Sequence, residues 1–175
     1  MAEIEIHHEH GHEEDPLSKR VGLMVGLTGI LLAVVTIAAH REHTSAVIHR
    51  TEANDQWSFY QAKKIREYTA DVGLQLLGAL ATDPARSEPT VRKLEASRAK
   101  YLEDAEGIKK EAEHKDQQTE HSEKLALRFD LGEGFLELGL VLCSLYFLGR
   151  RRVFPLVGGV SALVGIAVAA SALVL

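Results

Sequence analysis

Long apolar runs alternate with long charged segments along this chain of 175 residues. The three longest apolar runs are Val21–Ala39, Leu131–Leu148 and Val153–Leu175, and the first and third contain no charged residue. About 20 apolar residues in a helix are enough to cross the hydrocarbon core of a bilayer, which is roughly 30 Å thick. The pattern therefore predicts an all-α integral membrane protein with three transmembrane helices.

The charged segment between the first two runs predicts a long helical hairpin outside the membrane. Residues 40–81 contain no proline and consist mostly of strong helix formers, so the helix of the first span is expected to continue beyond the bilayer. Two prolines, an aspartate and a serine predict a turn at residues 82–89. A second helix of similar length is expected from about Pro89 to Arg128, antiparallel to the first.

The chain thus divides into six expected segments. In order they are a disordered tail rich in His and Glu (1–16), the first transmembrane helix (17–39), the hairpin (40–128, with its turn near 82–89), the second transmembrane helix (129–149), a basic turn (150–152) and the third transmembrane helix (153–175). The tail is expected to be disordered because it contains few residues that could form a core.

The second hairpin helix carries apolar residues at coiled-coil-like spacings of three and four, once Arg98 is allowed for. These residues are Leu94, Tyr101, Ala105, Ile108 and Ala112. A hairpin of only two helices buries little apolar surface by itself. We therefore expect copies of the chain to associate as a homo-oligomer.

The basic turn at residues 150–152 predicts the orientation in the membrane, because Lys and Arg in short loops favour the cytoplasmic side. The N-terminus would then be cytoplasmic, in agreement with Lys19 and Arg20, and the hairpin and C-terminus would be periplasmic or external. Four basic residues at the other membrane face argue for the opposite orientation: Arg41, Arg50, Lys124 and Arg128.

Three carboxylates share one face of the second span, namely Asp130, Glu133 and Glu137. A carboxylate in hydrocarbon is costly, and it usually faces protein or a water-filled cavity. These residues are therefore candidates for an ion-binding face that lines a pore between subunits. In the alternative interpretation, Asp130 and Glu133 lie among the lipid headgroups and Glu137 pairs with a neighbouring polar group.

Small residues at intervals of four are candidates for close helix packing, because they allow transmembrane backbones to approach each other. They are Gly22 and Gly26 in the first span, and Ser161, Gly165 and Ala169 in the third. The sequence leaves open whether this packing occurs within one chain or between chains.

The N-terminal tail contains His7, His8, His10 and His12 among carboxylates. Such a tail could bind Zn²⁺, Ni²⁺ or Cu²⁺ weakly, but its spacing differs from that of a closed structural zinc site. We therefore expect no firm metal site and no cofactor.

The first hairpin helix has a run of aromatic, amide and charged side chains that could form an interaction surface. Its members are Asp55, Gln56, Trp57, Tyr60, Gln61 and Lys64. The run could equally be part of the inner packing of the hairpin, and its periodicity favours packing.

The run Asp-Gln-Trp-x-x-Tyr-Gln-Ala-Lys at Asp55–Lys63 also carries a resemblance. Placed shortly after a first span, it resembles a family of bacterial inner-membrane proteins known only as domain of unknown function 4337. The His/Glu-rich start, the long helical middle and the basic turn at residues 150–152 fit the same family. The resemblance implies a three-span protein of the bacterial inner membrane and implies no reaction.

The motifs present point away from enzymes. No nucleophile elbow, phosphate-binding loop or zinc-protease motif occurs in the sequence, and no dominant basic face suggests a nucleic-acid partner. The leading hypothesis is a non-enzymatic oligomeric scaffold or sensor whose hairpin engages other copies of the chain or a protein partner. The alternative is a channel or ion-coupled transport component that uses the carboxylates of the second span.

Overall fold

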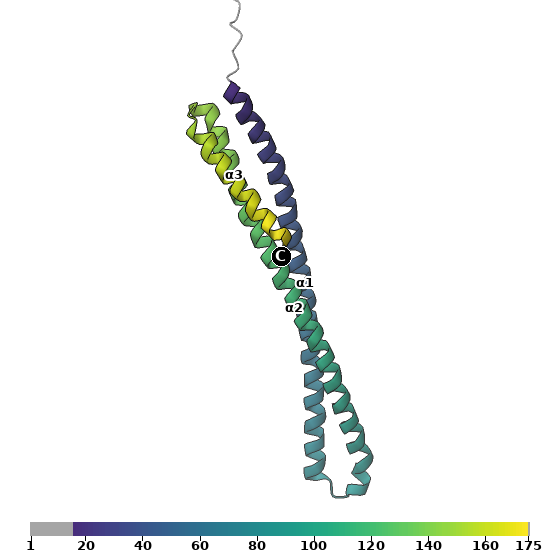
Figure 1. The fold of residues 1–175 in the computed structure, drawn as a ribbon. Helices are drawn as coiled ribbons and strands as arrows, with labels where there is room; N and C mark the ends of the chain where they lie inside the picture. Colours follow the sequence, from purple (N-terminus) through teal and green to yellow (C-terminus); the bar gives the residue numbers. More distant parts are fainter. Residues whose placement is uncertain (1–15, 175) are drawn as a thin grey trace, which may run out of the picture. The chain divides into compact units, whose positions relative to one another are not determined.

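The computed structural model describes residues 16–174, which form three α-helices and a short 3₁₀ helix. Helix α1 spans Pro16–Leu80, α2 spans Pro84–Gly149 and α3 spans Val153–Ser171, with the 3₁₀ helix η1 following at Ala172–Val174 (Figure 1). No strand occurs in this part of the chain, which confirms the predicted all-α fold. The three helices are each long and apolar enough to cross a membrane, as the sequence predicted.

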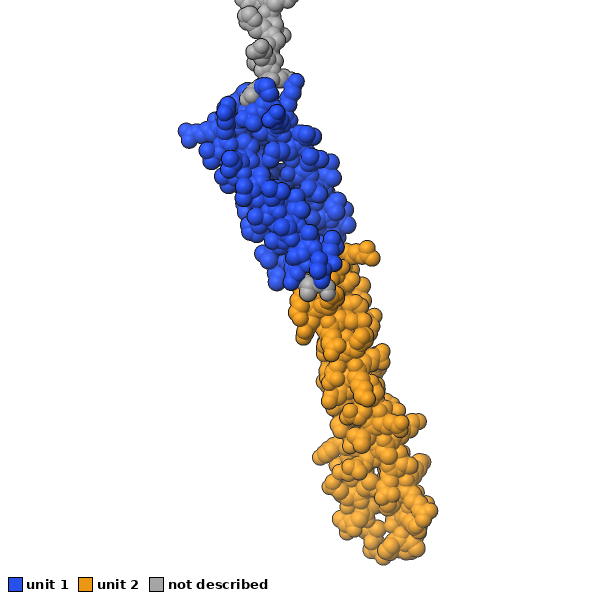
Figure 2. Space-filling model, viewed as in Figure 1, with its two compact units in different colours: residues 1–39, 127–175 blue, residues 40–126 orange. Residues whose placement is uncertain are grey.

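The chain forms two compact units, which have different colours in Figure 2. Unit 1 contains the described residues 16–39 and 127–174, and unit 2 contains residues 40–126. Helices α1 and α2 contribute to both units, whereas α3 belongs to unit 1 alone. Unit 1 therefore holds the three apolar runs, and unit 2 is the charged hairpin.

Asp83 fixes the turn of the hairpin. Its Oδ1 atom accepts hydrogen bonds from the backbone N–H groups of Ala85 at 3.0 Å and Arg86 at 3.4 Å. This is the role of a helix N-cap, and Pro84 beside it is suited to the first helical position. Helix α2 consequently starts earlier than the sequence analysis expected, and Pro89 lies inside it.

Small side chains fill the contact between the two helices of unit 2. The buried residues are Ala46, Ala53 and Ala70 of α1, with Ala105, Ala112, Thr119, Ser122 and Ala126 of α2. Tyr101 and Ile108, from the apolar series expected on the second helix, are half-buried on the same side. Because most buried side chains are so small, the hairpin buries little apolar surface, and several of its large apolar side chains lie outside.

In unit 1, α2 and α3 pack with their backbones almost in contact. A Cβ atom built on Gly158 would lie 2.8 Å from the carbonyl oxygen of Gly139, and one built on Gly165 would lie 2.7 Å from that of Gly132. Close approach through glycine is the packing that transmembrane helices use when no hydrophobic driving force acts between them. Two glycines on each helix therefore set the spacing of this pair.

The turn between α2 and α3 depends on Arg150. This residue has a left-handed backbone with φ of 50°, and its N–H donates to the carbonyl of Tyr146 at 2.8 Å. A left-handed residue commonly ends a helix, because it reverses the chain while satisfying a terminal carbonyl. Three consecutive arginines at residues 150–152 are thereby held at the end of unit 1.

Candidate functional site

Glu133 is a carboxylate of unit 1 that takes part in a hydrogen bond between two helices. It is half-buried on α2, and its Oε1 atom accepts a hydrogen bond from the Thr36 hydroxyl of α1 at 2.7 Å. Inside a hydrocarbon environment this contact offsets part of the cost of burying a polar group. Glu133 therefore joins α1 to α2 within the apolar part of the protein.

Glu137 lies one turn further along α2 and is exposed. Among the described residues it takes part in no hydrogen bond or ion pair. It follows Asp130, which is also exposed, by seven residues, or roughly 10 Å along a helix. Glu133 thus contacts another helix inside unit 1, whereas Glu137 lies on the outer surface of unit 1.

The sequence analysis did not find Thr36. A single hydroxyl within an uncharged run is a weak signal for the partner of a carboxylate. Arg128, which entered the sequence analysis only as a charge that bears on orientation, donates from its Nη1 atom to the carbonyl oxygen of Ser171 at 2.8 Å. Arginine at this position satisfies a terminal carbonyl of α3, so it fixes the end of that helix to α2.

The five candidate packing residues lie in different environments. Gly165 and Ala169 are buried, and the Ser161 hydroxyl donates to a backbone carbonyl of α2 at 2.8 Å. Gly22 and Gly26 are exposed, and a Cβ atom added to Gly26 would meet nothing within 4 Å. The row in the third span therefore packs within the chain, whereas Gly26 makes no close contact among the described residues.

Trp57 of the aromatic run faces the other helix of the hairpin. Its indole Nε1 donates to Oδ2 of Asp116 on α2 at 2.9 Å. Its ring meets Tyr60 edge to face, with a centroid separation of 5.6 Å. The hydrogen bond to Asp116 fits the packing interpretation for Trp57, whereas the ring contact with Tyr60 lies within α1.

The remaining members of the run differ in exposure. Asp55 and Gln61 are exposed, and Gln56 is half-buried. Lys64 pairs with Glu67 of its own helix, and this hydrogen bond raises the pKa of Lys64. Asp55 and Gln61 are thus the members of the run that stay available to another molecule.

Ion pairs between α1 and α2 help to set the register of the hairpin. Lys63 lies 2.6 Å from Asp104, and Lys115 lies 2.7 Å from Glu52. The hydrogen bond from Lys63 lowers the pKa of Asp104. The pKa of Glu52 is likewise lowered, chiefly by Lys115 and then by His49.

These lowered pKa values predict that acid weakens the hairpin. A carboxylate with a depressed pKa in the folded state stabilises that state above its unfolded pKa, near 4, and the contribution is lost as the pH falls through the folded value. We expect the thermal unfolding midpoint, followed by circular dichroism in detergent, to fall as the pH drops below about 4. Asp104→Asn combined with Glu52→Gln should reduce this fall, and an unchanged acid response would contradict the assignment.

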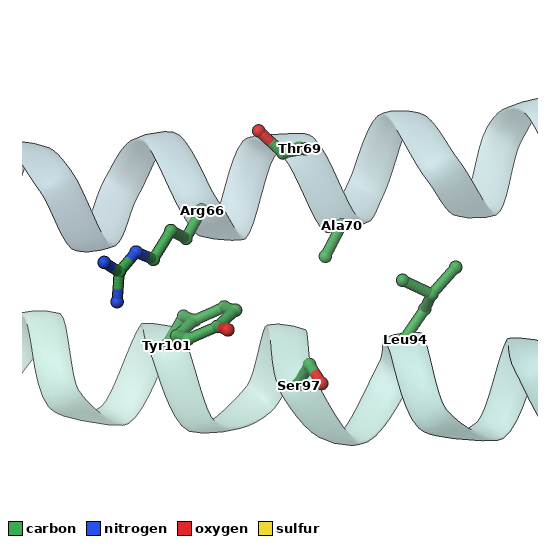
Figure 3. A pocket seen from close by; sticks show the side chains of 6 residues that line it. All are labelled: Arg66, Thr69, Ala70, Leu94, Ser97 and Tyr101. Carbon is green, nitrogen blue, oxygen red and sulfur yellow. The ribbon is translucent and has the colours of Figure 1, made fainter.

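A hollow of about 260 Å³ lies between α1 and α2 of unit 2 (Figure 3). It is lined by Arg66, Thr69, Ala70, Leu94, Ser97 and Tyr101. Figure 3 shows the guanidinium of Arg66 extending toward α2 beside Tyr101. The lining offers one cation and several hydroxyl groups, but no carboxylate or imidazole that could act as a general base.

Metal binding has no candidate site between residues 16 and 174. In that part of the chain no three His, Cys, Asp or Glu side chains are grouped so that they could hold an ion. His7, His8, His10 and His12, the weak candidates from the sequence, lie outside the described residues.

Comparison with known proteins adds one finding. A family model described as "Domain of unknown function (DUF4337)" matches residues 17–175. The match includes all three helices and both units. No curated protein and no solved structure matches the chain.

Proposed function

The chain belongs to the family described as Domain of unknown function (DUF4337), and from this premise we propose that it is a non-enzymatic, oligomeric membrane protein. In this proposal its hairpin is a scaffold or sensor element that engages other copies of the chain or a protein partner. The observation that carries the proposal is a row of large apolar side chains on the outer side of α1 in unit 2.

The row consists of the exposed residues Ile65, Tyr68 and Leu76, with the half-buried Val72 between them. The four recur at intervals of three and four and so share one face of the helix. Ile65 is 66% exposed, Tyr68 is 70% exposed and Leu76 is 54% exposed. A row of this kind is unusual on a monomer in water, and it marks an interaction surface when it is contiguous. Burial of the row would be favourable by about 25 cal/mol for each Å² removed from water.

The alanine-rich contact inside the hairpin explains why these side chains point outward. Ala46, Ala53 and Ala70 occupy the side of α1 that meets α2, whereas Ile65 and Leu76 lie on its exposed side. A second copy presents the same apolar row, so two rows can cover each other as in a coiled coil. Self-association is therefore the simplest way for the hairpin to remove this surface from water.

Negative charge within the apolar row of α1 should break the self-association of the hairpin. We expect Ile65→Glu combined with Leu76→Glu to convert oligomers to monomers, because each carboxylate would lose its hydration in the contact. The measurement is multi-angle light scattering of the detergent-purified full chain over a range of concentrations. Leu102→Glu, at a position on α2 that is 43% exposed, is the matched control and should leave the oligomer intact. A wild-type protein that is monomeric at every concentration would refute the proposal.

We place the protein in a bacterial inner membrane, with the N-terminus in the cytoplasm and the hairpin and C-terminus outside. Three apolar helices support a multi-pass membrane protein. The basic residues at one end of unit 1, namely Lys19, Arg20 and residues 150–152, support this orientation through the bias of short basic loops toward the cytoplasm.

A channel or ion-coupled transport component is the second candidate, and Glu137 favours it. An exposed carboxylate in an apolar span needs water or protein around it. In an oligomer whose α2 helices face a common axis, the Glu137 side chains would line a polar path.

A further inference from the structure

A basic pocket lies at one end of unit 1. It has a volume of about 430 Å³ and is lined by Pro16, Leu17, Arg20 and Arg152. Arg20 belongs to the start of α1, whereas Arg152 directly precedes α3. Two segments that are far apart in sequence therefore contribute one guanidinium each to the same hollow.

The described residues around this pocket carry positive charge, and Glu13, Glu14 and Asp15 directly precede Pro16 in the sequence. Lys19, Arg150 and Arg151 add three cations within the stretches 16–20 and 150–152, and these stretches contain no carboxylate. The nearest acidic residue along the described part of α2 is Glu137, twelve residues before Gly149, or about 18 Å along a helix. Cations gathered in this way create a local potential that attracts anions.

Arg20 and Arg152 are free to bind an anion. Both are exposed, and neither forms an ion pair or hydrogen bond with another described residue. A guanidinium carries five N–H donors in a planar arrangement that matches the oxygens of a phosphate. Two such groups on one pocket can bind different oxygens of the same phosphate.

The pocket lies where lipid phosphates would be. Val21 follows Arg20 and Val153 follows Arg152, and each valine begins a run that is apolar enough to cross a bilayer. The arginines therefore mark the boundary between hydrocarbon and headgroups. Pro16 and Leu17 supply an apolar wall beside the charged groups.

We propose that Arg20 and Arg152 bind the phosphate of an anionic phospholipid in this pocket. Basic pockets between transmembrane helices recognise anionic headgroups through such contacts. The bound lipid would connect the start of α1 to the turn between α2 and α3, and so support the packing of unit 1. This site is independent of the proposed self-association of the hairpin.

The test measures lipid binding to the full chain directly. Protein purified in a non-ionic detergent is titrated with phosphatidylglycerol or with phosphatidylcholine of the same acyl chains, and bound lipid is counted by native mass spectrometry. We expect selective binding of phosphatidylglycerol. Arg20→Gln combined with Arg152→Gln should weaken this binding about tenfold or more, because two phosphate contacts are removed.

A matched control separates a built pocket from general attraction. Arg150→Gln combined with Arg151→Gln removes the same charge from residues that do not line the pocket, and it should change the affinity less than about threefold. Equal weakening by the two double variants would overturn the proposal. Circular dichroism of both variants, expected to match the wild type, verifies that the helices are retained.

Two other anions could occupy the pocket, and each has its own outcome. If inorganic phosphate binds to the wild type and phosphatidylglycerol does not displace it, the site holds free phosphate and the lipid proposal is wrong. If the wild type binds no lipid but a variant with Glu13→Gln, Glu14→Gln and Asp15→Asn does, the chain's own carboxylates fill the site and the proposal is again overturned. Lipid binding that resists phosphate in the wild type supports it.

Discussion

Gly165→Ala should destabilise unit 1 by about 2 kcal/mol, which is a typical cost of overpacking a close contact. The added Cβ would lie 2.7 Å from the carbonyl oxygen of Gly132 and 3.0 Å from the backbone nitrogen of Leu136. Both are backbone atoms, so neither can rotate away as a flexible side chain would. Helices α2 and α3 would have to separate, and the contacts along their whole length would weaken.

Gly26→Ala is the matched control for this prediction. It introduces the same methyl group into an apolar helix, but nothing lies within 4 Å of the new atom. Alanine is a better helix former than glycine by about 1 kcal/mol, so this variant should be neutral or more stable. Unfolding in mixed micelles, followed by circular dichroism, measures both variants. Equal effects at the two positions would show that the α2–α3 contact is looser than the glycines indicate.

The two glycine positions show what sequence could and could not predict about packing. Both belong to rows of small residues at intervals of four, and such rows predict close approach of helices. The spacing does not identify the partner helix, because small residues at intervals of four occur both in helix contacts within a chain and in helix contacts between chains. Gly165 meets α2 within the chain, whereas a Cβ atom on Gly26 would meet no described residue of another helix within 4 Å.

The hairpin was predictable in outline because helix formers dominate residues 40–81 and a cluster of turn residues follows them. The position of its turn depended on Asp83, whose side chain caps α2 before Pro89. Which apolar side chains of the hairpin point outward was not predictable. Apolar positions on α1 cover more than one face, and alanines rather than larger residues fill the contact with α2.

The contact between Thr36 and Glu133 could not be found from sequence because the two residues are 97 positions apart. Their contact depends on the register between α1 and α2, and a local sequence pattern does not determine that register. The outward direction of Glu137 depends on the same register. Helical periodicity places both carboxylates on one face of α2, but only the packing of unit 1 shows that one faces α1 and the other faces outward.

Leu136→Glu should abolish folding of unit 1, whereas Glu137→Gln should leave the fold unchanged. Leu136 is 0% exposed, and its Cγ atom lies 3.0 Å from where a Cβ of Gly165 would be. A charge at this position would be enclosed between α2 and α3 without a partner, and a charged residue at the centre of a membrane helix costs about 3 kcal/mol even on the lower scales. Glutamine at position 137 keeps the size and polarity of a side chain that is already outside.

The measurements are the yield of folded protein in membranes and the unfolding midpoint in detergent. Leu136→Met is the control, because it preserves volume and should cost less than about 1.5 kcal/mol. If Leu136→Glu folds as well as Glu137→Gln, the face of α2 that meets α3 is not enclosed.

Since Glu137→Gln should fold, ion flux into proteoliposomes can be compared directly between this variant and the wild type. A large change in flux would favour the channel over the scaffold, because the substitution removes a charge without altering the helices. Unchanged flux with Glu133→Gln added would remove Glu133 and Glu137 from any ion path and would favour the proposed self-association of the hairpin.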